Sequence, residues 1–231
     1  MNMRAIDFVK VLLVTFLALF PVVNPIGDAP IFFALTQRYP QSVREILARK
    51  IAAYGFALLA ISFLFGSVIL DFFGVGLVAL QISGGLVLAA TGWSLLNQKD
   101  SDSSGNQTPG TLEDALDHAF YPLTLPITVG PGCIAIAITL GAHLRNQAGI
   151  GWWHGYPRDY LGALTGMLIL CILVLLCYRG AERLVSRLGR SGTSILIRLS
   201  AFILLAIGVQ IMWNGLSSGM PSIFSSPAPH T

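Results

Sequence analysis

Polar groups and prolines occur together in two segments of this chain that are otherwise apolar, at residues 20–30 and 121–131. The prolines are in register between the segments, at the same spacings of four and five: Pro21, Pro25 and Pro30, then Pro122, Pro126 and Pro131. An interior proline lacks a backbone N–H and frees the carbonyl four residues earlier, at about 3 kcal/mol. Such breaks offer N–H groups suited to a carboxylate and carbonyls suited to an ammonium group or a cation. A small zwitterion fits both.

The residues around each break identify a candidate binding site. The second half-helices are expected to begin near residues 27–28 and 130–132, and the freed carbonyls are those of Leu17, Pro21, His118 and Pro122. The candidate substrate-binding residues are Asn24, Gly27, Asp28, Thr124, Thr128, Gly130 and Gly132. The last two glycines would let a carboxylate approach the helix end and would allow the unwound φ/ψ of a break. A transmembrane threonine also commonly bonds its own preceding carbonyl, so that alternative stays open.

Asp28 has two interpretations that residue types cannot separate. An ionisable side chain at membrane depth is a functional candidate, which could bind a substrate ammonium group or carry a coupling proton. Aspartate is also a favoured N-cap, so it could instead begin the half-helix that follows. An ionised Asp28 would repel a carboxylate, so the second break, around residues 128–132, is the better carboxylate site.

The surrounding chain is too apolar for a soluble domain. Hydrophobic residues make up 54% of the 231 positions and charged residues 11%, and nearly all the charges fall between long apolar stretches. Stretches long enough to cross a hydrocarbon core of about 30 Å lie at 8–36, 46–70, 74–97, 118–143, 159–178 and 194–216. The sequence therefore predicts an all-α membrane protein with six transmembrane helices.

The two proline-rich segments lie in the first and fourth spans and mark an internal repeat. A weaker similarity joins span three to span six at Ser83/Ser200, Ala89/Ala206 and Asn97/Asn214. Because each half has an odd number of spans, the halves form two inverted three-helix repeats. We expect spans 1 and 4 to be broken near the midplane, with Asn24 and Thr124 facing a shared polar cavity across a pseudo-two-fold axis. Re-entrant loops, or prolines that merely kink the helices, are the alternatives.

The predicted domain organisation follows from the repeat. It comprises a first repeat at 1–97, a cytoplasmic linker at 98–117, a second repeat at 118–216 and a disordered tail at 217–231. Within the linker, Thr111 with Asp114 three residues later is a helix-start pattern.

Basic residues predict the orientation, because loops rich in Lys and Arg stay in the cytoplasm. One side holds Arg38, Arg44, Arg49, Lys50, Lys99, Arg179, Arg183, Arg187, Arg190 and Arg198. The other side holds Arg4, Lys10, Arg145 and Arg158. This asymmetry places both termini in the periplasm. Four aromatic residues then cluster at the outer interface: Trp152, Trp153, Tyr156 and Tyr160.

Other chemistries are not indicated. The basic residues form no groove or stripe for nucleic acid, and the four histidines show no metal-ligand spacing. Cys133 lies beside the second break without an adjacent base, so a buried thiol is favoured over a nucleophile. We expect no enzyme activity, no metal and no cofactor.

Taken together, the run at 24–30, the run at 122–132 and the six-span length resemble the MarC family of bacterial inner-membrane proteins, six-helix neutral amino acid transporters. The resemblance covers residues from about 10 to 216. It implies a carrier for small neutral amino acids of the glycine and alanine type in the inner membrane, driven by an ion gradient with a proton or sodium ion as the coupling partner. The alternative is a non-transporting binding, scaffold or channel-type protein that uses the same broken helices. Substrate identity, direction of transport and oligomeric state are left open by the sequence.

Overall fold

The structure is a computed structural model and describes residues 3–97, 111–147 and 157–224. Every regular element in these ranges is a helix. In chain order they are α1 (Met3–Val23), α2 (Pro25–Thr36), α3 (Gln41–Phe72), α4 (Leu77–Leu96), α5 (Leu112–His118), the π-helical η1 (Ala119–Thr128), α6 (Pro131–Gln147), α7 (Pro157–Arg179) and α8 (Ala181–Phe224). The all-α prediction is confirmed.

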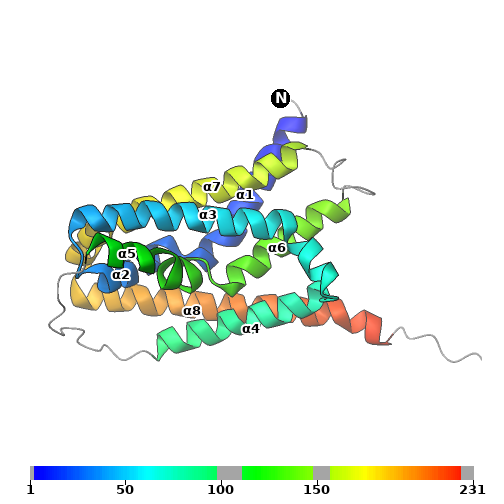
Figure 1. Cartoon of the computed structure of the whole chain (residues 1–231). Coiled ribbons are helices and arrows are strands. Elements are labelled where there is room, and N and C mark those ends of the chain that lie inside the picture. Colours follow the sequence, from blue (N-terminus) through cyan, green and yellow to red (C-terminus); the bar gives the residue numbers. More distant parts are fainter. Residues whose placement is uncertain (1–2, 98–110, 148–156, 225–231) are drawn as a thin grey trace, which may run out of the picture.

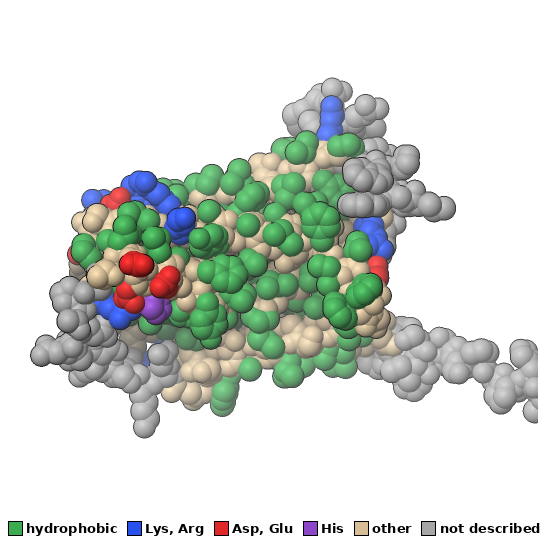
Figure 2. Space-filling view, viewed as in Figure 1, with side chains coloured by type: hydrophobic (Ala, Val, Ile, Leu, Met, Phe, Trp, Pro, Cys, Tyr) green, Lys and Arg blue, Asp and Glu red, His purple; other side chains and the backbone are tan. Residues whose placement is uncertain are grey.

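The helices that are long and apolar enough to cross a membrane coincide with the predicted spans. Five qualify alone among the described residues: Phe8–Thr36, Gln41–Phe72, Leu77–Leu96, Pro157–Arg179 and Ser191–Gly219. A sixth forms if Leu112–Thr128 and Pro131–Arg145, which meet at 69°, are counted as one. Figure 2 shows charged side chains at the two ends of the bundle and hydrophobic ones on the face between them. This is the surface of an integral membrane protein.

The break in the first span is confined to one residue. Asn24 has φ 46° and ψ 56°, in the left-handed region that asparagine tolerates better than most residues. Helical hydrogen bonding continues across it, from the Asn24 N–H to the Phe20 carbonyl at 2.8 Å and from the Asp28 N–H to the Asn24 carbonyl at 3.0 Å. The three prolines therefore do not unwind this segment. This differs from the sequence-based expectation, which was that the prolines would unwind it. The second half-helix also begins earlier than predicted, at Pro25.

The break in the fourth span is longer. Tyr121 and Leu125 have extended backbone angles inside η1, and the peptide bonds that follow them to Pro122 and Pro126 are cis. The chain then re-enters a regular helix at Pro131, within the predicted start at 130–132. The prolines thus act differently in the two segments, although their spacing is the same.

Each broken span packs against helices from the other half of the chain. α1 contacts α7, and α2 contacts α7 and α8. In the same way, η1 contacts α3, and α6 contacts α3 and α4. α1 also contacts α6, and α2 contacts η1, so the two broken spans lie next to each other.

α4 and α8 lie side by side along one edge of the bundle (Figure 1). Glycines bring their backbones together: a Cβ on Gly85 would lie 2.6 Å from the Gly208 carbonyl oxygen and from the Met212 nitrogen. A Cβ on Gly92 would lie 2.6 Å from the Leu205 nitrogen. Such close approach is typical of small residues at membrane helix interfaces.

One predicted boundary is corrected by the structure. The last helix continues to Phe224, so residues 217–224, predicted to be a disordered tail, are helical. Within the predicted linker, α5 begins after Thr111, whose hydroxyl accepts a hydrogen bond from the Asp114 N–H at 3.2 Å. That helix start is confirmed. The rest of the predicted linker and tail, and the aromatic residues Trp152, Trp153 and Tyr156, lie outside the described residues.

Candidate functional site

Asp28 lies in the first turn of α2, on the buried side of that helix. It is not the N-cap, because Asn24 takes that position and its side-chain oxygen accepts a 3.3 Å hydrogen bond from the Gly27 N–H. Of the two interpretations of Asp28, the cap is therefore excluded. Asp28 lies inside the span, eight residues or about 12 Å along the helix axis from Thr36, where α2 ends.

The Asp28 side chain is 9% exposed and has no hydrogen bond or ion pair with any of the described residues. Its electrostatic neighbours are the Cys133 thiol from α6 and the Tyr178 phenol from α7. A buried carboxylate without a partner is costly when ionised, and a bound cation or a proton would relieve that cost. Asp28 thus has the environment of a ligand-binding or proton-carrying group.

Tyr178 links the helices around Asp28. Its ring stacks on Phe32 of α2 with centroids 4.4 Å apart and planes at 12°. Its hydroxyl lies 2.8 Å from the Thr128 hydroxyl of η1, and both residues are buried. Residues from the two broken spans therefore meet at one tyrosine on α7.

Gly27 lies at a crossing of α2 with α8. A Cβ placed on Gly27 would overlap the Asn24 amide nitrogen and the Ser200 hydroxyl, and it would lie 2.7 Å from Ser200 Cβ. The absence of a side chain at Gly27 therefore lets Asn24 and Ser200 approach each other over the start of α2. Asn24 itself is half-buried.

The two candidate threonines use their hydroxyls within the backbone of η1. Thr124 donates to the Ala119 carbonyl at 2.7 Å and Thr128 donates to the Leu123 carbonyl at 2.7 Å. Thr124 is fully buried, and its carbonyl accepts a further hydrogen bond from the Val129 N–H at 2.8 Å, which closes the C-terminal half of η1. These bonds are the alternative that the sequence left open for both threonines. Of the two, Thr128 also contacts another helix, through Tyr178.

The glycines of the second break do not have the predicted backbone role. Neither Gly130 nor Gly132 has a positive φ; among the described residues the positive-φ glycines are Gly74 and Gly189. Cys133, the third residue of α6, is buried close to this break. The start of α6 therefore places the Cys133 thiol within electrostatic range of Asp28, and the carboxylate site at this helix end stays a prediction.

Gly132 also serves helix packing, because a Cβ there would collide with the side chain of Leu88 on α4. We therefore expect Gly132→Ala to lower the stability of the protein by about 1–3 kcal/mol, the usual cost of overpacking. In a protein that already carries Leu88→Ala, adding Gly132→Ala should lower the stability much less, because the truncated side chain at position 88 leaves room for the new methyl group. Thermal unfolding of the four proteins in detergent checks this, and equal costs in both backgrounds would contradict it.

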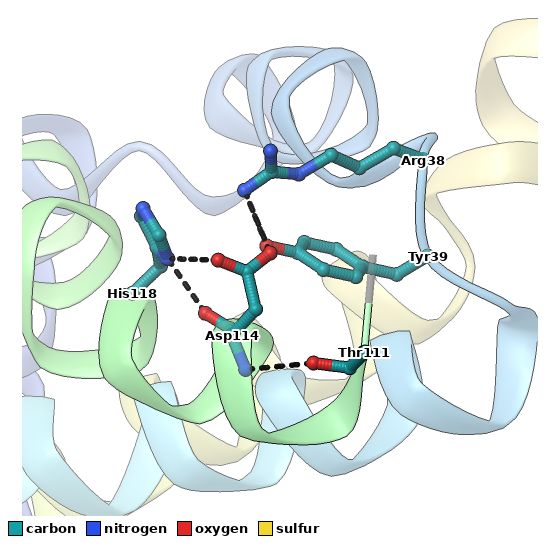
Figure 3. Close-up of polar contacts among 5 residues, drawn as sticks. All are labelled: Arg38, Tyr39, Thr111, Asp114 and His118. Atoms are coloured by element: carbon teal, nitrogen blue, oxygen red, sulfur yellow. Dashed lines mark hydrogen bonds and ion pairs between the residues drawn. The ribbon is translucent and has the colours of Figure 1, made fainter. Parts of the chain in front are cut away.

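Polar residues at one end of the bundle join α5 to the α2–α3 turn (Figure 3). Arg38 pairs with Asp114 at 3.1 Å and donates to the Tyr39 hydroxyl at 2.6 Å, while Tyr39 donates to Asp114 at 2.9 Å. His118 lies against the Asp114 carbonyl oxygen at 2.6 Å. Burial raises the pKa of Tyr39, and its hydrogen bond to Asp114 raises it further, so the phenol stays protonated and donates to the carboxylate.

Three further ion pairs also connect the two halves of the chain. At the same end, Arg44 pairs with Glu182, and Glu45 pairs with Arg179 at 3.1 Å. At the opposite end, Asp71 pairs with Arg145 at 2.8 Å. Partly exposed pairs of this kind contribute about 0–1 kcal/mol each, so they can be exchanged at little cost.

Two residues of the site were missed by sequence reasoning. Tyr178 precedes Arg179 at the end of a span, so its type and position indicated only an interfacial aromatic. Ser200 was noted as part of the weak repeat and not as a neighbour of Gly27. No local signal identifies either residue, because both reach the site through contacts between helices that are far apart in sequence.

Comparison with known proteins gives a consistent result. The family model described as "MarC family integral membrane protein" matches residues 9–220. The chain is 32% identical to the UPF0056 membrane protein YvbG of Bacillus subtilis (strain 168), over 91% of this chain and 96% of that protein. It is 30% identical to the UPF0056 membrane protein MJ1677 of Methanocaldococcus jannaschii, over 90% and 97% of the two chains. It is 26% identical to the UPF0056 inner membrane protein MarC of Salmonella typhimurium, over 91% and 96%.

No solved structure gives a significant match. The family model spans nearly the whole chain, including both proline-rich segments, the buried Asp28 and the six predicted spans except the first residue of span one. The chain therefore belongs to the MarC family of integral membrane proteins.

Proposed function

We propose that this protein is a secondary transporter that moves small neutral amino acids of the glycine and alanine type across the inner membrane by alternating access. The observation that carries the proposal is Asp28, which lies nine-tenths buried within a membrane span without a hydrogen-bond or ion-pair partner among the described residues. Ionisable residues in such positions mark substrate and ion pathways in membrane proteins. A scaffold that only packs helices has no use for an unpaired buried carboxylate.

Asp28 and the start of α6 together suit a zwitterion. In this proposal the substrate ammonium group binds at Asp28, and the substrate carboxylate binds to N–H groups at the start of α6, near Gly130. Those two positions come from different broken spans that lie next to each other. The two charged groups of glycine are separated by one carbon atom, so this proposal requires the ammonium site and the carboxylate site to lie close together.

The helix packing supports two inverted three-helix repeats as the basis of transport. The first broken span packs on the second and third spans of the other half, and the second broken span does the same in return. Reciprocal packing of this kind, in which each half contributes a broken span to the other, is typical of transporters with a pseudo-two-fold axis. In such transporters one repeat rocks against the other around a central site. The weak ion pairs between the halves at both ends then form and break as each end closes and opens.

We further propose that the coupling partner is a proton or sodium ion. The end that carries Arg38, Arg44 and Arg179 faces the cytoplasm in this proposal, which puts both termini in the periplasm.

The test is the flux of labelled glycine and alanine, with a panel of other small solutes, in proteoliposomes that contain the purified full chain. We expect concentrative uptake of at least one of the two amino acids under an imposed pH or sodium gradient, and counterflow without a gradient. The two gradients are imposed separately to identify the coupling ion. Protein-free liposomes are the control. Absence of flux for every solute would reject the transporter and favour a non-transporting binding or scaffold protein.

A further inference from the structure

The hydrogen bond between Tyr178 and Thr128 has a direction that the surrounding contacts determine. A threonine hydroxyl has one proton, and Thr128 donates it to the Leu123 carbonyl at 2.7 Å. A carbonyl oxygen cannot donate in return. In the 2.8 Å contact between the two hydroxyls, Tyr178 is therefore the donor and Thr128 the acceptor.

With its proton held by Thr128, the Tyr178 oxygen offers only acceptor lone pairs to its other neighbours. Asp28 lies one helical turn before Phe32, and these two positions share a face of α2. Phe32 stacks on the Tyr178 ring, so Asp28 lies on the face that holds Tyr178, consistent with their electrostatic interaction. Side chains on helices lean toward the N-terminus of the helix, which brings the phenol oxygen of Tyr178 back from Arg179 toward the interior.

An ionised carboxylate is also an acceptor without donors. The Asp28 carboxylate and the Tyr178 oxygen are thus two acceptors associated with the same buried face of α2, and the other group that interacts with Asp28 is the Cys133 thiol, a weak donor. Two acceptors facing one space repel each other unless a donor separates them. An ammonium group carries several N–H donors and a positive charge, and it satisfies both.

We propose that Tyr178 is the specificity-determining residue of this site, and that with Asp28 it selects ligands bearing a primary ammonium group through N–H donation. This inference rests on the proposed function, because it concerns the same site. It specifies only the ammonium group of the ligand and does not depend on the rest of the substrate. The competing mode is a cation–π contact with the stacked rings of Tyr178 and Phe32, which would favour a quaternary ammonium group instead.

Methylammonium and tetramethylammonium separate the two modes, because they carry the same charge and only the first has N–H donors. Their effect on the thermal unfolding of the full chain in detergent is measured at equal concentration and ionic strength. We expect methylammonium to raise the melting temperature of the wild-type protein and tetramethylammonium to have no effect. Equal stabilisation by both cations, or none by methylammonium, would overturn the proposal.

Tyr178→Phe keeps the ring that stacks on Phe32 and removes the hydroxyl. We expect it to weaken methylammonium binding by about tenfold or more, the usual effect of losing one hydrogen bond to a charged group. Tyr160→Phe is the matched control, because Tyr160 also contacts a phenylalanine, Phe63, at 5.7 Å but on a different part of α7. Unchanged methylammonium affinity in Tyr178→Phe would overturn the role of Tyr178.

The cation assay also separates this inference from the proposed function. Stabilisation by methylammonium, lost in Tyr178→Phe, together with no glycine or alanine flux in proteoliposomes would support the acceptor site and reject the amino acid transporter. Amino acid flux that Tyr178→Phe leaves unchanged, with no response to methylammonium, would support transport and reject the acceptor site.

Discussion

Replacing Asp28 with asparagine is expected to reduce glycine and alanine flux by about 30-fold or more, because truncating one partner of a buried charged contact costs 2–5 kcal/mol or more. The substitution keeps the size of the side chain and its place in the first turn of α2. Asp28→Glu keeps the charge but moves it by one methylene, so a smaller loss is expected. Flux is measured in proteoliposomes at matched protein content.

The stability of Asp28→Asn distinguishes a functional role from a structural one. Asp28 has no hydrogen bond or ion pair with the described residues, so neutralising it leaves no partner unsatisfied. We expect the melting temperature of Asp28→Asn to equal or exceed that of the wild type. Asp117→Asn is the control, because Asp117 is an exposed acid on α5 outside the site, and its flux should be unchanged. Wild-type flux in Asp28→Asn would remove Asp28 from the mechanism.

Substitution of Gly208 by valine is expected to cause the largest loss of stability. Its Cβ would overlap the Ala89 nitrogen and would lie 2.7 Å from the Gly85 carbonyl oxygen and 2.9 Å from Ala89 Cα. All three are backbone atoms of α4, which cannot rotate away as a side chain can. The two helices would have to separate along their whole contact, at a cost at or above the usual overpacking range of about 1–3 kcal/mol.

Size-exclusion chromatography and thermal unfolding in detergent measure this effect. Ala206→Val is the matched control, because it adds bulk two residues away on the exposed side of α8 and should leave both measurements unchanged. Gly85→Val, on the other side of the same contact, should reproduce the loss. A monodisperse Gly208→Val protein with the wild-type melting temperature would show that α4 and α8 do not approach as closely as they do here.

The all-helical class and the positions of the long apolar helices could be predicted from the sequence, and so could the two proline-rich segments where the regular helix is interrupted. These features depend on local chemistry. A span is recognised because a run of about 20 apolar residues matches the hydrocarbon thickness, and a break because proline lacks an N–H. The start of α5 was predictable for the same reason, since Thr111 and Asp114 form their hydrogen bond within a single turn.

The form of each break was less predictable. Equal proline spacing suggested equal unwinding, but the first break is absorbed by one left-handed residue, Asn24, while the second extends through η1. Proline determines which hydrogen bonds are lost locally. Which conformation then replaces them depends on the helices packed against each segment, α7 and α8 in one case and α3 and α5 in the other.

The sequence by itself determined an all-α membrane protein with two proline-rich breaks and a buried acid beside one of them. The tertiary structure decided what surrounds that acid: the cap falls on Asn24, Tyr178 joins Phe32 of α2 to Thr128 of η1, and Gly132 packs on Leu88. The physical reason is the range of the interactions. Hydrophobic length, capping and proline effects act over one or two helical turns, whereas the composition of the site depends on which turns of helices distant in sequence are brought together.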